Sequence, residues 1–132
     1  MIGLGGNGMV RIRVENFAKL AVVECSGRIV HSDAVFKLRD TVQAQDTPVI
    51  ILDMSEVDGI GGGGLGMLVF LEHWARENEV QLKLFCPSDA VLEGLAQIRF
   101  LTNLEIATFQ EVMGLLARAG EQYGSASSPL AA

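Results

Sequence analysis

The chain has 132 residues, of which 49% are hydrophobic and 20% are charged, a composition typical of one folded domain with its own core. Its formal net charge of −6 argues against nucleic-acid binding, which needs a basic surface to neutralise phosphates. Glycine or charged residues interrupt the apolar stretches before they reach the roughly 18 residues of a membrane span, so we expect no membrane insertion.

The composition of the two ends differs from that of the middle. Residues 1–8 are rich in glycine and lack the basic and apolar regions of a signal peptide, and residues 120–132 are small and polar. We therefore expect a flexible N-terminus, a domain over 9–119 and a disordered tail. The two cysteines, Cys25 and Cys86, lie far apart without metal-ligand spacing, which favours buried thiols in a reduced, cytoplasmic protein.

The first predicted elements are two strands of a hairpin. Residues 10–14 alternate between apolar and polar side chains, the pattern of a half-exposed strand. A turn is expected at 15–18, and the apolar run 20–25 predicts the second strand. Ser26 and Gly27 are expected to end it.

A helix and a central strand follow. Ser32 or Asp33 can cap a helix whose apolar residues over 34–42 recur on one face. The run 49–52 is the most apolar of the chain, which indicates a strand covered on both faces.

The second half of the chain continues the alternation of helix and strand. Helical spacing of apolar residues predicts a helix over about 64–78, and 80–85 reads as a strand. A third helix is expected after Pro87-Ser88, a short strand at 104–106 and a last helix over 109–119.

The resulting order is β-β-α-β-α-β-α-β-α. An opening hairpin followed by alternating helices and strands predicts an α/β domain with a mixed sheet of four to five strands, mostly parallel in its later part, and about four helices. Phe70 and Trp74 lie beside the apolar stripe of the second helix, where we expect core packing; anchoring of a partner is the alternative.

Four consecutive glycines, Gly61 to Gly64, separate the central strand from the second helix. The tract fits the dinucleotide pattern GxGxxG formally, but it does not follow the strand directly and no acid ends the next strand. A P-loop needs Lys-Ser/Thr after the last glycine, where this chain has Leu65-Gly66. The sequence thus favours a tight, closely packed turn into the helix, with an anion cradle at the helix N-terminus as the alternative.

The polar residues near the tract do not form a catalytic constellation. Ser55 is expected to bond local backbone, Asp53 to stabilise the loop and Asp58 to be solvated, rather than Asp53 and Asp58 acting as a carboxylate pair for catalysis or Mg²⁺. His31 and His73 fall on different elements without metal-ligand spacing. We therefore predict no enzyme, no cofactor and no metal site.

Residues 53–68 read Asp-Met-Ser-Glu-Val-Asp-Gly-Ile-Gly-Gly-Gly-Gly-Leu-Gly-Met-Leu. This segment resembles the signature of the STAS domain, found in anti-sigma-factor antagonists of bacterial partner-switching systems and their relatives. In that family a strand ends in Asp-Leu/Met-Ser, and an apolar residue precedes Asp-Ser-Ser/Thr-Gly-Leu-Gly-x-Leu at the head of a helix. The resemblance extends over about 10–118 and implies a STAS-like single domain that binds a protein partner.

This sequence departs from the family pattern at the positions that regulate partner binding in the family. Gly61, Gly62 and Gly63 occupy the positions of Asp-Ser-Ser/Thr, and the serine aligned with Gly62 is the residue that the partner kinase phosphorylates in the family. Glycine has no hydroxyl, so this phosphoryl transfer cannot occur here. The family's frequent Gly-Glu-Leu-Asp is replaced by residues 27–30, Gly-Arg-Ile-Val, which removes an acidic partner-facing position.

The resemblance implies a non-catalytic interaction module that lacks the phospho-switch, and so either binds its partner constitutively or acts as a scaffold. The expected partner is a kinase-type anti-sigma factor or a scaffold protein, and homodimerisation stays open. The residues expected at the partner surface are Arg28, His31, Asp58, Gly61, Gly62, Gly63, Gly64 and Met67.

Two other functions stay open at this point. STAS-like domains without the phosphoserine also occur as accessory subunits of transporters and as parts of signalling scaffolds. The glycine-rich helix N-terminus could instead make the domain a nucleotide or anion sensor.

Overall fold

The computed structural model describes the backbone of residues 10–131 and the side chains of residues 10–120. The predicted flexible segment 1–8 lies outside the described residues. The element order is β-β-α-β-α-β-α-β-α, which confirms the order predicted from the sequence. The elements are β1 (Val10–Phe17), β2 (Leu20–Ile29), α2 (Ser32–Gln43), β3 (Val49–Ile60), α3 (Gly62–Glu77), β4 (Gln81–Phe85), α4 (Asp89–Ile98), β5 (Glu105–Ala107) and α5 (Phe109–Ala131).

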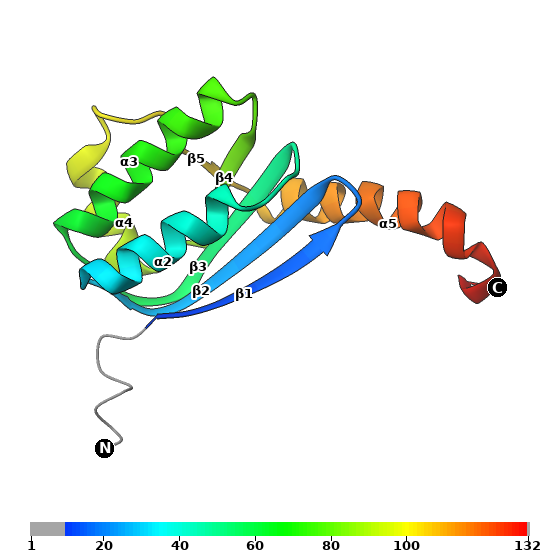
Figure 1. The fold of residues 1–132 in the computed structure, drawn as a ribbon, viewed down its shortest axis with the longest axis horizontal. Coiled ribbons are helices and arrows are strands. Elements are labelled where there is room, and N and C mark those ends of the chain that lie inside the picture. Colours follow the sequence, from blue (N-terminus) through cyan, green and yellow to red (C-terminus); the bar gives the residue numbers. More distant parts are fainter. Residues whose placement is uncertain (1–9, 132) are drawn as a thin grey trace, which may run out of the picture.

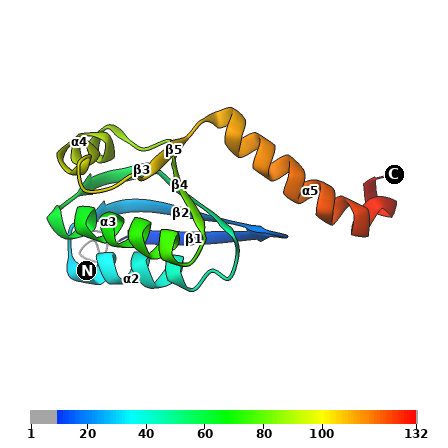
Figure 2. The same cartoon turned by 90° about the horizontal axis from the view of Figure 1, so that it is seen from above.

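The five strands form one sheet in the order β1-β2-β3-β4-β5. β1 and β2 make an antiparallel hairpin, and β2 to β5 are parallel, so the predicted mixed sheet is confirmed. Figure 1 shows α2 and α3 side by side along one face of the sheet. Figure 2 shows α5 on the opposite side, with its distal part projecting away from the sheet.

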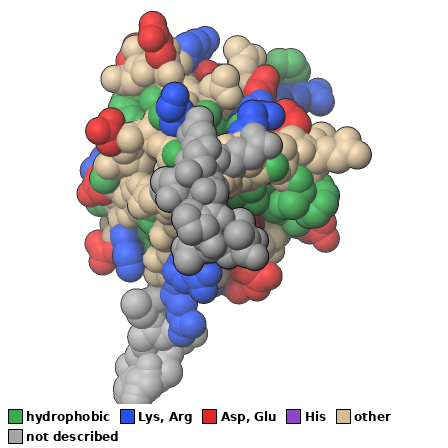
Figure 3. All heavy atoms as spheres, turned by 90° about the vertical axis from the view of Figure 1, so that its right-hand side faces the viewer, with side chains coloured by type: hydrophobic (Ala, Val, Ile, Leu, Met, Phe, Trp, Pro, Cys, Tyr) green, Lys and Arg blue, Asp and Glu red, His purple; other side chains and the backbone are tan. Residues whose placement is uncertain are grey.

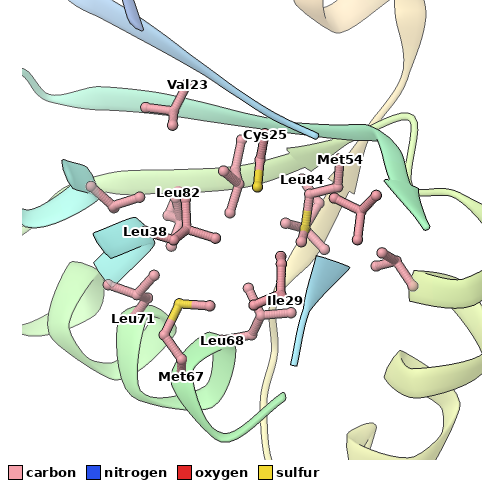
Figure 4. Close-up of a cluster of buried hydrophobic side chains, with 14 of the residues drawn as sticks. Val23, Cys25, Ile29, Leu38, Met54, Met67, Leu68, Leu71, Leu82 and Leu84 are labelled. Atoms are coloured by element: carbon pink, nitrogen blue, oxygen red, sulfur yellow. The ribbon is translucent and has the colours of Figure 1, made fainter. Parts of the chain in front are cut away.

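The main core lies between the sheet and the helices α2 and α3. Alternate residues of the strands point into this layer, because successive side chains of a strand face opposite sides. Figure 4 shows Met67, Leu68 and Leu71 of α3 directed toward the strands. They meet inward residues of β2, β3 and β4, among them Val23, Cys25, Ile50, Leu52, Met54 and Leu84.

β2 and β3 are both longer than the sequence predicted. β2 continues through Ser26 and Gly27, and β3 continues from Leu52 to Ile60. Polar residues and glycine lower the strand propensity of both segments, which is why their ends were predicted too early. Pairing between the two strands overrides propensity here, and the positive φ of 101° at Gly27 lets β2 pass the irregular register without strain.

Of the two N-caps predicted from the sequence, the structure confirms the cap of α4 and contradicts the cap of α2. Ser88 caps α4 as predicted, since its hydroxyl oxygen accepts a hydrogen bond from the amide of Val91 at 3.3 Å. α2 begins one residue earlier than expected. His31 is its N-cap residue and makes no side-chain cap bond, so the predicted capping by Ser32 or Asp33 is wrong.

α5 packs on the outer face of the sheet and forms a second, smaller core. Val112, Leu115 and Ala119 belong to a cluster with Leu20 and Ile51. The backbone of α5 continues to Ala131, where the composition had predicted a disordered tail from 120.

Candidate functional site

The glycine tract lies at the carboxyl ends of the parallel strands. The amide of Gly61 donates a hydrogen bond to the carbonyl oxygen of Ile29 at 3.0 Å, which joins the head of α3 to the end of β2. The Arg28 side chain lies against Gly59, which pairs with Arg28 in the sheet. The segments predicted to form a partner surface, 28–31 and 58–64, are therefore neighbours in space.

Gly64 is a packing residue. A side-chain carbon added there would lie 2.7 Å from Cγ1 of Ile60 and 3.0 Å from both Cγ2 and the carbonyl oxygen of Ile29. The carbonyl oxygen is backbone and cannot move aside, so only glycine fits. Gly64 is buried and does not belong to the surface on which the sequence analysis placed it.

The other three glycines do not have this constraint. An added carbon at Gly62 would meet no atom within 4 Å, and those at Gly61 and Gly63 would make only ordinary contacts at 3.7 and 3.8 Å. Among the described glycines a positive φ occurs at Gly27, so none of these three needs a left-handed backbone. Packing and backbone geometry would thus admit a serine at Gly62.

The remaining predicted surface residues divide between solvent and core. Arg28, His31 and Asp58 are exposed, as a partner surface requires. Met67 is buried, at 5% relative exposure, because the helical spacing turns it toward the sheet. It still forms part of the floor of a hollow between α2 and α3.

That hollow is an apolar groove of about 230 Å³, hereafter the α2–α3 groove. Phe36 and Phe70 stand beside it, 50% and 49% exposed. The core position expected for Phe70 is therefore wrong, whereas Trp74 packs against the core as expected. The groove is lined by Val35, Phe36, Arg39, Gly63, Gly66, Met67 and Phe70.

Phe36 is not among the residues predicted for the partner surface. The sequence did carry a signal, since Phe36 lies outside the apolar stripe of α2 formed by Ala34, Leu38 and Val42. A large aromatic off the stripe of a helix is expected to face solvent or a partner. In the structure the guanidinium of Arg39 lies 4.8 Å from the centre of the Phe36 ring, which helps to fix the ring at the surface.

Of the candidate hydroxyl and carboxylate residues, Asp53 and Ser55 line one hollow on the outer face of the sheet, and Asp58 is not among the lining residues of that hollow. The backbone amide of Ser55 donates to Oδ1 of Asp53 at 3.0 Å, a local bond of the kind expected for that carboxylate. Burial raises the pKa of the Cys25 thiol to about 12, with a further contribution from the charge of Asp53. Cys86 is exposed, so its predicted burial is wrong: it follows the end of β4 with a φ of 52°.

The described part of the chain contains neither a metal-binding cluster nor a membrane-spanning helix. Within residues 10–120, no group of three or more His, Cys, Asp or Glu side chains is arranged to hold a metal ion. None of the described helices has the length and apolar character needed to cross a bilayer. On the face shown in Figure 3, acidic and basic side chains are interspersed, without a large patch of one sign.

Comparison with known proteins adds to this geometry. The sequence profile of the STAS domain matches residues 11–113. A search of curated protein sequences gives no match.

Among the solved structures that share the fold at low identity are three anti-sigma factor antagonist or cell-fate determinant structures. SpoIIAA, an anti-sigma factor antagonist, in its unphosphorylated form is 18% identical, with a TM-score of 0.63 over 81% of this chain and 96% of its own. An anti-sigma factor antagonist from Mycobacterium paratuberculosis is 19% identical, with a TM-score of 0.61 over 81% and 94%. The phosphorylated form of the Bacillus cell fate determinant SpoIIAA is 15% identical, with a TM-score of 0.61 over 80% and 99%.

Proposed function

The chain belongs to the STAS-domain family, and we propose that it is a non-catalytic, phosphorylation-independent antagonist that binds a kinase-type anti-sigma factor. The observation that carries the proposal is the α2–α3 groove, which lies beside the glycine head of α3. Two family relatives of the same fold are described as anti-sigma factor antagonists, which supports a protein partner for this chain.

The α2–α3 groove has the properties of a protein-binding surface. Its lining is almost entirely apolar, and two half-exposed phenylalanines border it. Burying the exposed half of each ring against a partner would contribute about 2 kcal/mol per residue. An aromatic pair beside a small apolar hollow is typical of the residues that dominate binding at interfaces.

The glycine tract beside the groove accounts for the missing switch. A phosphoserine would add about −1.5 to −2 charge to the head of α3, next to an apolar binding surface, and such a charge disrupts binding when it must be desolvated. Gly61, Gly62 and Gly63 carry no hydroxyl, and the nearest one in the chain, on Ser55, lies in β3. The domain would therefore keep its binding-competent state in the presence of the kinase and ATP.

An affinity capture from lysate of the source organism, read by mass spectrometry, tests the proposal. The native domain is the bait, in parallel with Phe36→Ser and Phe70→Ser. We expect the native domain to retain an ATPase of the anti-sigma-factor type and each variant to retain at least about tenfold less. Phe100→Ser is the matched control, because Phe100 is 86% exposed but lies outside the groove.

Capture of the same ATPase by all four baits would show that the groove is not the binding surface. Recovery of transporter or scaffold components in place of an ATPase would overturn the antagonist role and favour the accessory-subunit alternative.

A further inference from the structure

The outer face of the sheet, opposite to α2 and α3, has two halves of different character. Near the start of β2 and β3 the outward side chains are apolar, and α5 covers them. Further along the same strands the outward positions become charged or hydroxyl-bearing, at Glu24 and Ser26 in β2 and at Asp53 and Ser55 in β3. Figure 2 shows that α5 leaves the sheet rather than continuing over this second half.

This polar half is hollowed. A depression of about 510 Å³ lies across the three strands of β1, β2 and β3, hereafter the outer hollow. Its volume falls in the range of small-molecule sites and is far larger than a single ion requires. Its lining includes Arg11, Arg13, Glu24, Asp53, Ser55 and Glu56.

A β-bulge concentrates polar side chains on the floor of the outer hollow. The β2–β3 register shifts between the pairs Glu24–Asp53 and Ser26–Glu56, so two residues of β3 oppose one residue of β2. Met54 and Val57 both point into the core, and the two residues between them, Ser55 and Glu56, both line the outer hollow. Bulges that re-aim side chains in this way are frequent beside functional sites.

Charges of opposite sign face each other across the outer hollow. Arg13 is paired with Glu24 at 3.0 Å, but Arg11 and Asp53 make no ion pair within the described residues. Asp53 is half-buried and next to Glu24 in the register, so the two carboxylates repel each other.

We propose that the outer hollow binds a small zwitterion of the basic amino-acid class, with its cationic side chain at Asp53 and its carboxylate at Arg11. A cation between the carboxylates of Glu24 and Asp53 relieves their repulsion. Arg11 on β1 and Asp53 on β3 are two strands apart and offset by two residues along the register, roughly 12 Å between their Cα atoms. The long side chain of Arg11 shortens the gap between its guanidinium and the Asp53 carboxylate, so the two charged ends of a basic amino acid can reach both groups. This site lies on the other face of the sheet from the α2–α3 groove and does not depend on the proposed antagonist function.

Titration of the full chain with L-arginine, followed by backbone-amide NMR, tests the proposal. The expected result is a saturable shift of the Glu24, Ser26 and Ser55 amides in the millimolar range, as befits a small ligand in an open site. Two probes dissect the charges: agmatine lacks the carboxylate, and L-citrulline lacks the side-chain charge. Both are expected to bind more weakly than L-arginine.

Two variants test which protein side chains bind the two charged ends of the ligand. Asp53→Asn keeps an oxygen that can accept the Ser55 amide and is expected to weaken L-arginine about tenfold, since it removes one charged hydrogen bond. Arg11→Gln, at an exposed position, is expected to weaken L-arginine but leave agmatine unchanged. Asp58→Asn, an exposed carboxylate outside the outer hollow, is the control and should not change either titration.

The proposal is overturned if no amide of the outer hollow shifts saturably, or if sodium chloride at equal ionic strength reproduces the shifts. Equal binding by the native chain and Arg11→Gln would also overturn it, even if Asp53→Asn did not fold.

Discussion

The same residue types, glycine and cysteine, have different surroundings in two regions of the molecule. One region is the packed layer between the sheet and α3, and the other is the surface just outside this layer. Gly64 and Cys25 lie in the layer, where every added atom or charge meets packed neighbours. Gly62 and Cys86 lie at the surface, where the surrounding space is open or solvated. The glycine tract therefore combines two features: packing requires glycine at Gly64, and it does not require glycine at Gly61, Gly62 or Gly63.

The largest effect is expected from Gly64→Ala. The added methyl group overlaps Ile60 and the backbone of Ile29, so we expect the free energy of unfolding in urea to fall by about 2–3 kcal/mol. Gly63→Ala is the matched control, one residue away, where the added carbon makes only an ordinary contact with Val35 at 3.8 Å, and it should not lower stability. If the two variants are equally stable, Gly64 is not required by packing and the difference between the packed layer and the surface is wrong.

Alkaline pH provides the second test, through Cys25. Its pKa is raised in the folded state from the ordinary value of 9.0 to about 12, so its contribution to stability is complete below about pH 9 and is lost as the pH rises toward 12. Each pH unit in that window costs up to about 1.4 kcal/mol. We expect Cys25→Ala to flatten the decline in unfolding free energy measured by urea titration at several pH values. Cys86→Ala should retain the full decline, and an identical slope in both variants would contradict the account.

The smallest effect is expected from Gly62→Ala. Alanine is favoured over glycine in a helix by up to about 1 kcal/mol, and the added methyl group meets no atom. We therefore expect a modest rise in the urea midpoint with an unchanged m-value. A loss of stability would mean that Gly62 itself has a structural role.

The order of elements could be predicted because it rests on local patterns. The apolar run 49–52 and the helical spacing in α3 each report burial directly, and Ser88 carries the chemistry of an N-cap. The lengths of β2 and β3 could not be predicted, since polar residues continue both strands. Their extension depends on pairing between segments that are distant in the sequence, including a bulge that no local pattern indicates.

The candidate site could be predicted only in part, because some of its residues belong to a local motif and others meet only through packing of distant segments. Arg28, His31, Asp58 and the glycines follow from the resemblance to a family motif, and the structure brings their segments together. The α2–α3 groove depends on the packing of two helices, so Phe36 and Phe70 gain their common surface only in three dimensions. The core position of Gly64 likewise depends on contacts with Ile29 and Ile60 rather than on its neighbours in the tract.

The most direct test of the central claim restores the missing hydroxyl. The native domain and Gly62→Ser are each bound to the captured kinase-type anti-sigma factor, ATP is added, and both phosphate incorporation and partner release are measured. We expect Gly62→Ser to fold normally, take up phosphate and release the partner, while the native domain stays unlabelled and bound. Labelling of the native chain within residues 55–64, or its release on addition of ATP, would show that its binding is not independent of phosphorylation.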